Sequence, residues 1–181
     1  MCGSISSLMS AVHCIPIDPF YLTWKAREYG VATRFIELAG EINSGMPAYV
    51  VQKLVDALNE RGNPVKKSRI LVLGVAYKRD TKNDPRESPG LEIIEDLIAK
   101  RARVDYSDPH LPNLPIGRRH QFDLTSVTLT ETRLREYDAV LVVTDHSRFP
   151  YEVIFRAAPL IVDTRNALHS RGFRGPHVVS A

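Results

Sequence analysis

The feature that most constrains the fold is an alternation, from about residue 65 onward, between short apolar runs and stretches with helical spacing. Residues 70–73, Ile-Leu-Val-Leu, form a continuous apolar run, which is typical of a strand covered on both faces. Ser88 and Pro89 then open a helix, as its N-cap and its first residue. Because strand and helix follow one another repeatedly, the pattern predicts an α/β domain with a parallel sheet between helices. The further elements expected are strands at 104–106, 139–143 and 160–162 and a helix at 151–157.

The N-terminal third has a different, helical pattern. Apolar residues recur at intervals of three and four from Thr33 to Arg61, which predicts one long amphipathic helix. Gly45 and Pro47 interrupt this stripe and are expected to kink the helix. A long helix with a single apolar stripe packs against a neighbour, so we expect a subunit contact along it. A shorter helix is expected at 20–29.

The expected organisation is an unstructured start at residues 1–12, a helical segment at 13–64 and an α/β domain at 65–181. Lys+Arg 24 against Asp+Glu 21 gives a net charge of +3 with the two signs interleaved, which argues against a nucleic-acid-binding face. No apolar run approaches the roughly 20 residues that span a bilayer. The N-terminal sequence is a poor signal peptide, and two cysteines make a disulfide framework unlikely. We therefore expect a cytoplasmic protein without nucleic-acid or membrane partners.

Cys14 and Asp18 form the first candidate catalytic pair. A thiol in a proline-rich turn, with a carboxylate four positions later, fits a nucleophile and an acid that places water or a proton. The same spacing also fits a small buried side chain and a helix-capping aspartate. The spacing alone leaves both interpretations open.

The loop after the first expected strand is the second candidate site. Lys78 and Arg86 in this loop form a plausible anion clamp, because ligands of parallel sheets bind beyond the carboxyl ends of the strands and a helix N-terminus attracts phosphate. Gly74 stands alone there, so the glycine-rich fingerprint GxGxxG of a dinucleotide site is absent. A solvated, charged loop is the alternative interpretation.

Polar side chains follow the other expected strands as well. Asp108 and His110 follow the second strand, Asp145 and His146 follow the third, and Asp-Thr-Arg-Asn at 163–166 follows the fourth. Because the carboxyl ends of parallel strands meet at one edge, these groups suggest a single site, although Asp-Pro and Asp-Thr are also common turn sequences. No pair among them has the spacing of a known metal motif, so no metal site is predicted.

Several segments occur in the order in which they occur in one enzyme family. HCIPIDPFYL at 13–22 is similar to an active-site cysteine segment, and EIN at 41–43 with the following Met-Pro is similar to a central dimerisation helix. GVAYK at 74–78 and RESP at 86–89 are similar to the start of a UDP-binding domain. Together they resemble the UDP-glucose/GDP-mannose dehydrogenase family, and most closely its UDP-N-acetylglucosamine and UDP-N-acetylmannosamine 6-dehydrogenases. Further ordered matches are at 107–109, 144–147 and 163–166.

The resemblance implies an enzyme of polysaccharide biosynthesis that uses NAD to oxidise the C6 alcohol of a UDP-sugar to a carboxylate, and a Rossmann-like α/β domain that binds UDP. By this resemblance, Cys14 is the nucleophile that traps the intermediate aldehyde, and Asp18 helps to position the hydrolytic water. Lys78 matches the family's lysine that contacts the UDP-sugar, and Arg165 matches an arginine near the nucleotide. The resemblance also implies a homodimer through the helix at 33–61.

The family's NAD-binding domain has no counterpart in this sequence, so we expect the C-terminal portion of such an enzyme, inactive alone. A non-catalytic module that binds UDP or dimerises is the alternative. A cysteine-based acyl transferase, in which Cys14 works with His13 or His146, is a further alternative. No oxyanion-type glycine turn precedes the cysteine, which counts against it.

Overall fold

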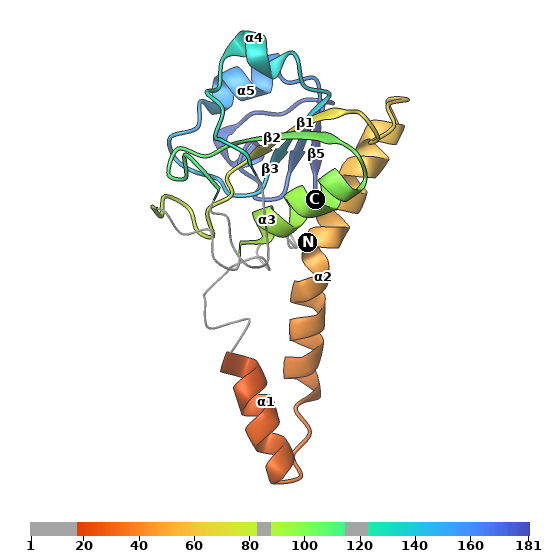
Figure 1. Ribbon diagram of the computed structural model, residues 1–181, viewed down its shortest axis with the longest axis vertical. Helices are drawn as coiled ribbons and strands as arrows, with labels where there is room; N and C mark the ends of the chain where they lie inside the picture. Colours follow the sequence, from red (N-terminus) through yellow and green to blue (C-terminus); the bar gives the residue numbers. More distant parts are fainter. Residues whose placement is uncertain (1–17, 83–87, 115–122) are drawn as a thin grey trace.

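The computed structural model describes residues 18–82, 88–114 and 123–181. It has a helical arm and an α/β domain (Figure 1). The predictions for residues 1–12, Cys14 and Arg86 lie outside the described residues. The helices are α1 (Asp18–Glu28), α2 (Arg34–Asn59), α3 (Pro89–Ala99), α4 (Glu131–Leu134), α5 (Tyr151–Ala157) and the 3₁₀ turn η2 (His169–Arg171). The strands are β1 (Arg69–Leu73), β2 (Arg103–Ser107), β3 (Ala139–Val142), β4 (Ile161–Asp163) and β5 (Val178–Ser180).

The five strands form one parallel sheet in the order β2-β1-β3-β4-β5, which confirms the predicted α/β fold. The chain runs from β1 outward to β2 and then returns to the other side of β1 to form β3. The direction of winding therefore reverses between β1 and β3. In open parallel sheets, ligands bind in the crevice outside the carboxyl ends of the strands at such a reversal.

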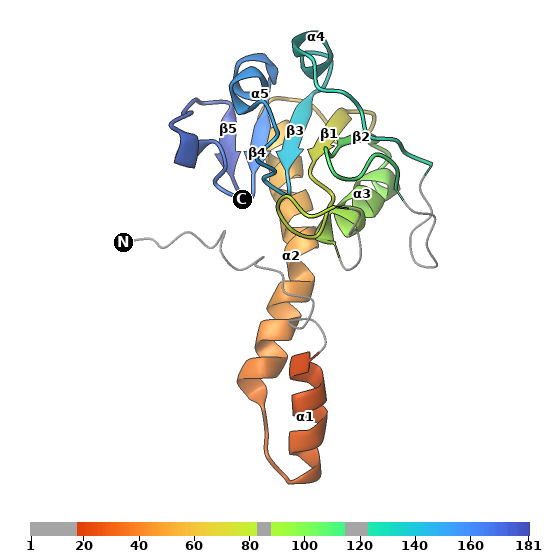
Figure 2. The same ribbon diagram turned by 90° about the vertical axis from the view of Figure 1, so that its left-hand side faces the viewer.

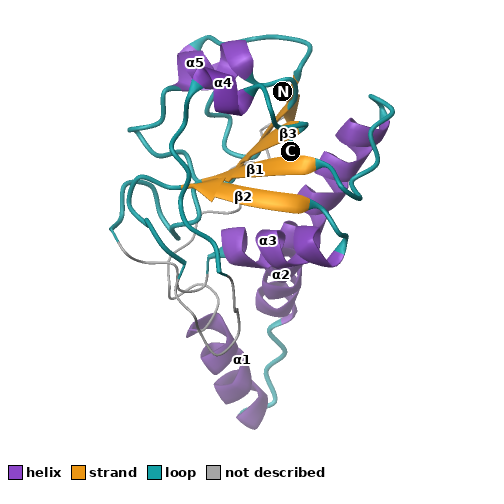
Figure 3. Ribbon diagram, turned by 45° about the horizontal axis from the view of Figure 1, so that its top comes forward, coloured by secondary structure: helices purple, strands orange, loops and turns teal. Residues whose placement is uncertain are grey.

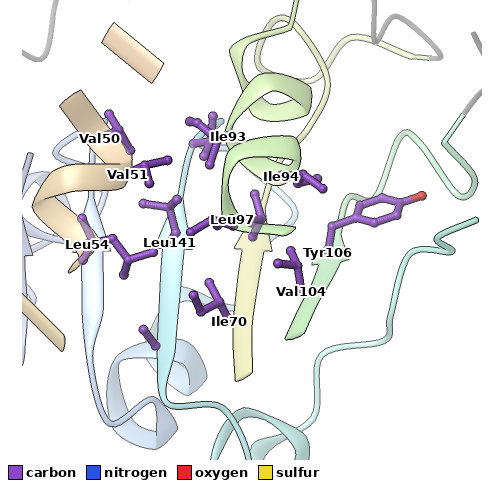
Figure 4. Close-up of a cluster of buried hydrophobic side chains, with 14 of the residues drawn as sticks. Val50, Val51, Leu54, Ile70, Ile93, Ile94, Leu97, Val104, Tyr106 and Leu141 are labelled. Carbon is purple, nitrogen blue, oxygen red and sulfur yellow. The ribbon is translucent and has the colours of Figure 1, made fainter. Parts of the chain in front are cut away.

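Alternate residues of the strands enter two separate cores, so that the sheet is the middle layer between helices (Figure 3). Ile70 and Val72 of β1 pack toward α2 and α3, and Figure 4 shows side chains of both helices directed at this face. Leu71 and Leu73 of β1 pack on the other face, toward α4 and α5. Full burial of one such side chain stabilises the fold by roughly 1.5–3 kcal/mol. This two-sided burial explains the uninterrupted apolar sequence of β1.

Helix α2 spans both parts of the molecule (Figures 1 and 2). It is assigned without a break from Arg34 to Asn59, with Pro47 inside it. Its second half belongs to the core of the α/β domain, where Val50, Leu54 and Leu58 are fully buried. Its first half extends beyond the sheet and contacts α1.

Helices α1 and α2 form a hairpin that encloses an apolar hollow. The ring of Phe20 rests against Gly40, where an added Cβ would lie 2.4 Å from the ring. Thr33 Oγ1 donates a hydrogen bond to Thr23 Oγ1 at 3.0 Å and so links the turn to α1. The hollow has a volume of about 270 Å³ and is lined by Pro19, Phe20, Phe35, Ile36, Ala39, Gly40, Asn43 and Ser44. Over the described part of the chain, every helix is too short or too polar to cross a membrane.

Candidate ligand site at the carboxyl edge of the sheet

The loops that follow β1 and β3 meet at the reversal of the sheet. We call residues 74–82 the β1 loop and residues 143–150 the β3 loop. Gly74 begins the β1 loop with a φ of +77°, and a Cβ there would lie 2.2 Å from the carbonyl oxygen of Thr144. Thr144 Oγ1 in turn donates a hydrogen bond to the carbonyl of Ala76 at 2.9 Å. The close approach of the two loops therefore requires glycine at position 74.

The buried carboxylate of Asp108, which follows β2, anchors the β1 loop. Its Oδ2 accepts hydrogen bonds from the backbone N–H groups of Val75 and Ala76, both at 2.8 Å, and lies 3.0 Å from His146 Nε2. Its Oδ1 accepts the backbone N–H of His110 at 2.8 Å. Burial raises the pKa of this carboxyl, but the hydrogen bond from His146 and those from the backbone donors lower it below its ordinary value.

The imidazole of His146 joins Asp108 to the far end of the β1 loop. It has no exposed surface, and its Nδ1 accepts the backbone N–H of Asp80 at 2.9 Å. Since Nδ1 is an acceptor, the proton of the neutral ring is on Nε2, which therefore donates to Asp108. This assignment follows from the partners of the two nitrogens.

The side chain of Asp80 lies on the outer side of this network. Its Oδ1 accepts the backbone N–H of Ser147 at 2.9 Å and lies 3.5 Å from Nε2 of His110. Burial raises the pKa of the Asp80 carboxyl, whereas the hydrogen bond from Ser147, the nearby His110 and the charge of Arg79 lower it, with a net result of about 2. Asp80 is therefore ionised near neutral pH.

Asp80, His110 and His146 also bring three atoms of metal-ligating type within 4.8 Å of one another. Both nitrogens of His146 already have hydrogen-bond partners in this arrangement. A metal ion bound there would have to displace the backbone N–H of Asp80. The geometry thus describes a hydrogen-bonded network, and we assign no metal to it.

Three cationic side chains lie at the same edge of the sheet. Lys78 is exposed, and its Nζ lies 5.9 Å from the ring centre of Tyr77. The carboxylate of Asp145 in the β3 loop lies 3.5 Å from the guanidinium of Arg79 and 3.7 Å from that of Arg165. Charge-assisted hydrogen bonds are normally about 2.7–2.9 Å long, so these two ion pairs are loose. The edge thus presents three cationic side chains together with two carboxylates, Asp145 between two arginines and Asp80, whose Oδ2 lies 3.4 Å from Nε of Arg79.

The turn that presents Arg165 is shaped by the buried Asp163 at the end of β4. Its two carboxylate oxygens accept the backbone N–H groups of Arg165 at 3.0 Å and Leu168 at 2.8 Å. On the other side of the site, α3 begins beside the β1 loop, where a Cβ on Gly90 would lie 3.2 Å from the Cα of Val75. Ser88 caps this helix start, whose dipole favours an anion nearby.

The structure brings together some of the residues singled out in the sequence. Lys78 and Arg165 lie at the carboxyl edge of the sheet. Asp18 is the exposed first residue of α1, on a different element. Figure 2 shows the arrowhead of β3 pointing toward the part of the molecule that contains α1. Cys14 and Arg86 fall outside the described ranges, so the structure does not position them.

Two features of the site were not assigned from the sequence. Arg79 was not singled out, although its place beside Lys78 in a loop after a strand was a usable signal. Asp108 and His146 were expected at one edge of the sheet, but their pairing, which joins positions 38 residues apart, was not predicted. No local spacing indicates such a contact.

Comparison with known proteins identifies the family. The family model described as "UDP-glucose/GDP-mannose dehydrogenase family, UDP binding domain" matches residues 71–170, more than half of the chain. The chain therefore belongs to the UDP-glucose/GDP-mannose dehydrogenase family, and its α/β domain is that family's UDP-binding domain. This confirms the resemblance stated above.

Curated relatives agree with this assignment. A UDP-N-acetyl-D-glucosamine 6-dehydrogenase of Pseudomonas aeruginosa is 32% identical over 137 residues, which are 76% of this chain and 31% of the relative. A UDP-N-acetyl-D-mannosamine dehydrogenase of Methanococcus maripaludis is 34% identical over 137 residues, which are 76% of this chain and 28% of the relative. The chain thus spans about a third of the length of these relatives or less.

Solved structures also agree. The UDP-D-ManNAc dehydrogenase from Pyrococcus horikoshii matches with a TM-score of 0.71 and 26% identity, over 93% of this chain and 38% of its own. An NDP-N-acetyl-D-galactosaminuronic acid dehydrogenase from Methanosarcina mazei matches with a TM-score of 0.74 and 25% identity, over 94% of this chain and 37% of its own. Both matches extend beyond the α/β domain into the helical arm.

Proposed function

We propose that the carboxyl edge between β1 and β3 binds the UDP part of a UDP-sugar, as the nucleotide half of an NAD-dependent UDP-sugar 6-dehydrogenase site. The observation that carries this proposal is the place of the cationic side chains. Lys78 and Arg79 follow β1 at the reversal of the parallel sheet, and Arg165 follows β4 at the same edge, in a domain that matches the family's UDP-binding domain. The reversal is where nucleotides bind in related architectures.

The chemistry of a diphosphate fits this edge. Its oxygens carry negative charge, which lysine neutralises as a point charge and arginine with a planar pair of donors. Asp80 and Asp145 hold Arg79 only loosely, at 3.4 and 3.5 Å, so an incoming phosphate competes with these two carboxylates for the guanidinium. The N-terminus of α3 adds a partial positive charge. Arg86, just before this helix, is the further proposed contact from the sequence.

Calorimetric titration of the 181-residue chain with UDP tests this proposal. Lys78→Ala and Arg165→Ala should each weaken UDP binding about tenfold, since hydrogen bonds to charged groups contribute roughly 1.5–3 kcal/mol. Lys100→Ala is the matched control, because Lys100 is an exposed lysine at the other end of α3 and should leave the affinity unchanged. Wild-type chain that releases no heat with UDP, or equal affinities for all variants, would refute the proposal.

The catalytic part of the proposal rests on the sequence. Cys14 is the proposed nucleophile that adds to the aldehyde carbon, and Asp18 the residue that positions the hydrolytic water. We propose that hydride transfer to NAD needs residues beyond these 181, so that the chain alone binds UDP without oxidising the sugar. The absorbance of NADH in a mixture of chain, NAD and UDP-sugar tests this, and steady turnover by the chain alone would contradict it.

The helical arm is the proposed dimerisation surface. Phe35 is 88% exposed, and Leu38 and Ile42 are about half exposed on the same helix. Exposed apolar patches of this kind mark interaction sites, and a second copy of α2 is the partner that we propose for it. The proposed setting is polysaccharide biosynthesis in the cytoplasm.

A further inference from the structure

We propose that Asp108 and His146 are positioning residues that hold the β1 loop in its binding conformation, and that protonation of His146 releases this loop. The proposal rests on the proposed function, because the loop they hold carries Lys78 and Arg79. Neither side chain is itself proposed to touch the nucleotide. The two are buried beneath the loop, with no exposed side-chain surface.

The first argument is how the backbone of the loop is held. Three of its N–H groups, those of Val75, Ala76 and Asp80, are donated to Asp108 or His146, at 2.8, 2.8 and 2.9 Å. These anchors lie on both sides of the residues at 77–79. A loop held on both sides presents its cationic side chains with less loss of conformational freedom on binding.

The second argument is that one form of His146 satisfies both anchors. Neutral imidazole with its proton on Nε2 donates to Asp108 and accepts from the N–H of Asp80. In the protonated ring both nitrogens are donors, so Nδ1–H faces the N–H of Asp80 and that hydrogen bond is lost. The Asp80 carboxylate, with Oδ1 3.7 Å from Nδ1, is the acceptor to which the new donor can turn, and the backbone N–H of Asp80 then loses its anchor.

The titratable groups around His146 differ in whether their charge changes near neutral pH. Asp108 and Asp80 face the ring, and both have a lowered pKa, so they stay charged across about pH 5 to 8, where histidine changes its charge. Tyr151 donates its hydroxyl to the carbonyl of His146 at 2.9 Å and its pKa is raised. His110 has the other imidazole beside this ring, with its ring centre 4.9 Å from that of His146.

The test compares the pH dependence of ligand binding between variants. UDP-glucose is the probe, because each of its phosphates has one ester and one anhydride bond and no proton that titrates in this range, whereas the terminal phosphate of UDP does titrate there. His146→Gln keeps one donor and one acceptor but cannot take up a proton, whereas His146→Leu removes both. His110→Gln is the matched control that removes the neighbouring imidazole. Affinity is measured by calorimetry at several values between about pH 5 and pH 8.

We expect the affinity of the wild type to fall about tenfold toward the acid end, as expected for the loss of a buried hydrogen bond. His110→Gln should retain this fall. His146→Gln should bind within a few-fold of wild type at the alkaline end and show no fall. A fall that persists in His146→Gln, or that disappears in His110→Gln, would overturn the proposal, as would wild-type affinity in a folded His146→Leu.

A second readout separates this proposal from the proposed function. Amide hydrogen exchange of Val75, Ala76 and Asp80 reports the anchors without any ligand. At one pH, exchange at these three amides should be faster in His146→Leu than in His146→Gln, with no difference in β1. If wild type does not bind UDP-glucose, the proposed function fails, and this exchange pattern alone decides whether the two residues hold the loop. Equal exchange in both variants would refute the positioning role.

Discussion

The two halves of helix α2 carry one apolar stripe but have different surroundings. In the second half, Val50, Leu54 and Leu58 are fully buried against the sheet and α3. In the first half, Phe35 is 88% exposed and Leu38 is 51% exposed. The amphipathic pattern therefore predicts the helix, whereas what covers its apolar face depends on the neighbouring elements. The buried half packs into the UDP-binding domain. The other half contacts α1, and its exposed apolar side chains are the surface proposed for a partner.

The largest loss of stability is expected in the α/β domain, from a substitution at the contact between the β1 and β3 loops. Gly74→Ala should lower the free energy of unfolding by about 3–5 kcal/mol, because it adds left-handed backbone strain and a clash with the carbonyl of Thr144. Gly62→Ala is the control, since Gly62 has a similar φ of +74° and no atom within 4 Å of the added Cβ. It should cost only about 1–2 kcal/mol in urea unfolding. Equal losses would mean that the loops do not meet as described.

A pair of leucines tests the two halves of α2 directly. Leu54→Ala should cost about 3 kcal/mol of unfolding free energy, since the side chain is fully buried and leaves a cavity. Leu38→Ala removes a half-exposed side chain and should cost less than about 1 kcal/mol when the protein is dilute. Similar losses in dilute urea titrations would contradict the distinction between the halves.

Substitutions in the exposed half of α2 should weaken self-association. Phe35→Glu and Ile42→Glu place a charge on the apolar face and should weaken dimerisation at least tenfold, with little change in the stability of the monomer. Asn59→Glu, at the exposed end of the same helix, is the control for the added charge. Sedimentation equilibrium measures the dissociation constant. A dimer that is equally tight in all three variants would exclude this face as the interface.

A smaller loss of stability is expected at acid pH. The pKa of Asp108 is lowered in the folded state, so its contribution to stability is present above the unfolded pKa of about 4 and is lost as pH falls through the lower folded value. The free energy of unfolding should therefore decline below about pH 4. Asp108→Asn should be less stable near neutral pH and should show a shallower decline. Parallel declines in both proteins would assign the acid effect to other carboxylates.

Much of the fold could be predicted from the sequence, because strands buried on both faces and amphipathic helices have distinct patterns. The helix expected at 33–61 is α2, and the apolar run at 70–73 lies in β1. Strand β5 and helix α4 were not predicted. Each is only three or four residues long, and β5 lies at the edge of the sheet, where no uninterrupted apolar run is needed.

The candidate site could be predicted only in outline. Its place at the carboxyl ends of the strands follows from the α/β pattern, and Lys78 and Arg165 lie there. The network around Asp108 could not be predicted, because it depends on the order β2-β1-β3, which places the ends of these three strands side by side. Asp-Pro and Asp-His sequences taken alone predict turns, and they do not indicate which carboxylate is buried.

The most direct test of the central claim is to map UDP binding residue by residue, by the amide NMR shifts of the 181-residue chain during a titration. The account predicts that shifts concentrate in the β1 loop, in the β3 loop and around Arg165, at the carboxyl ends of β1, β3 and β4. The opposite edge of the sheet, represented by Lys67 and Arg101, should stay unchanged. Shifts confined to that opposite edge or to α1, or no shifts at saturating UDP, would contradict the account.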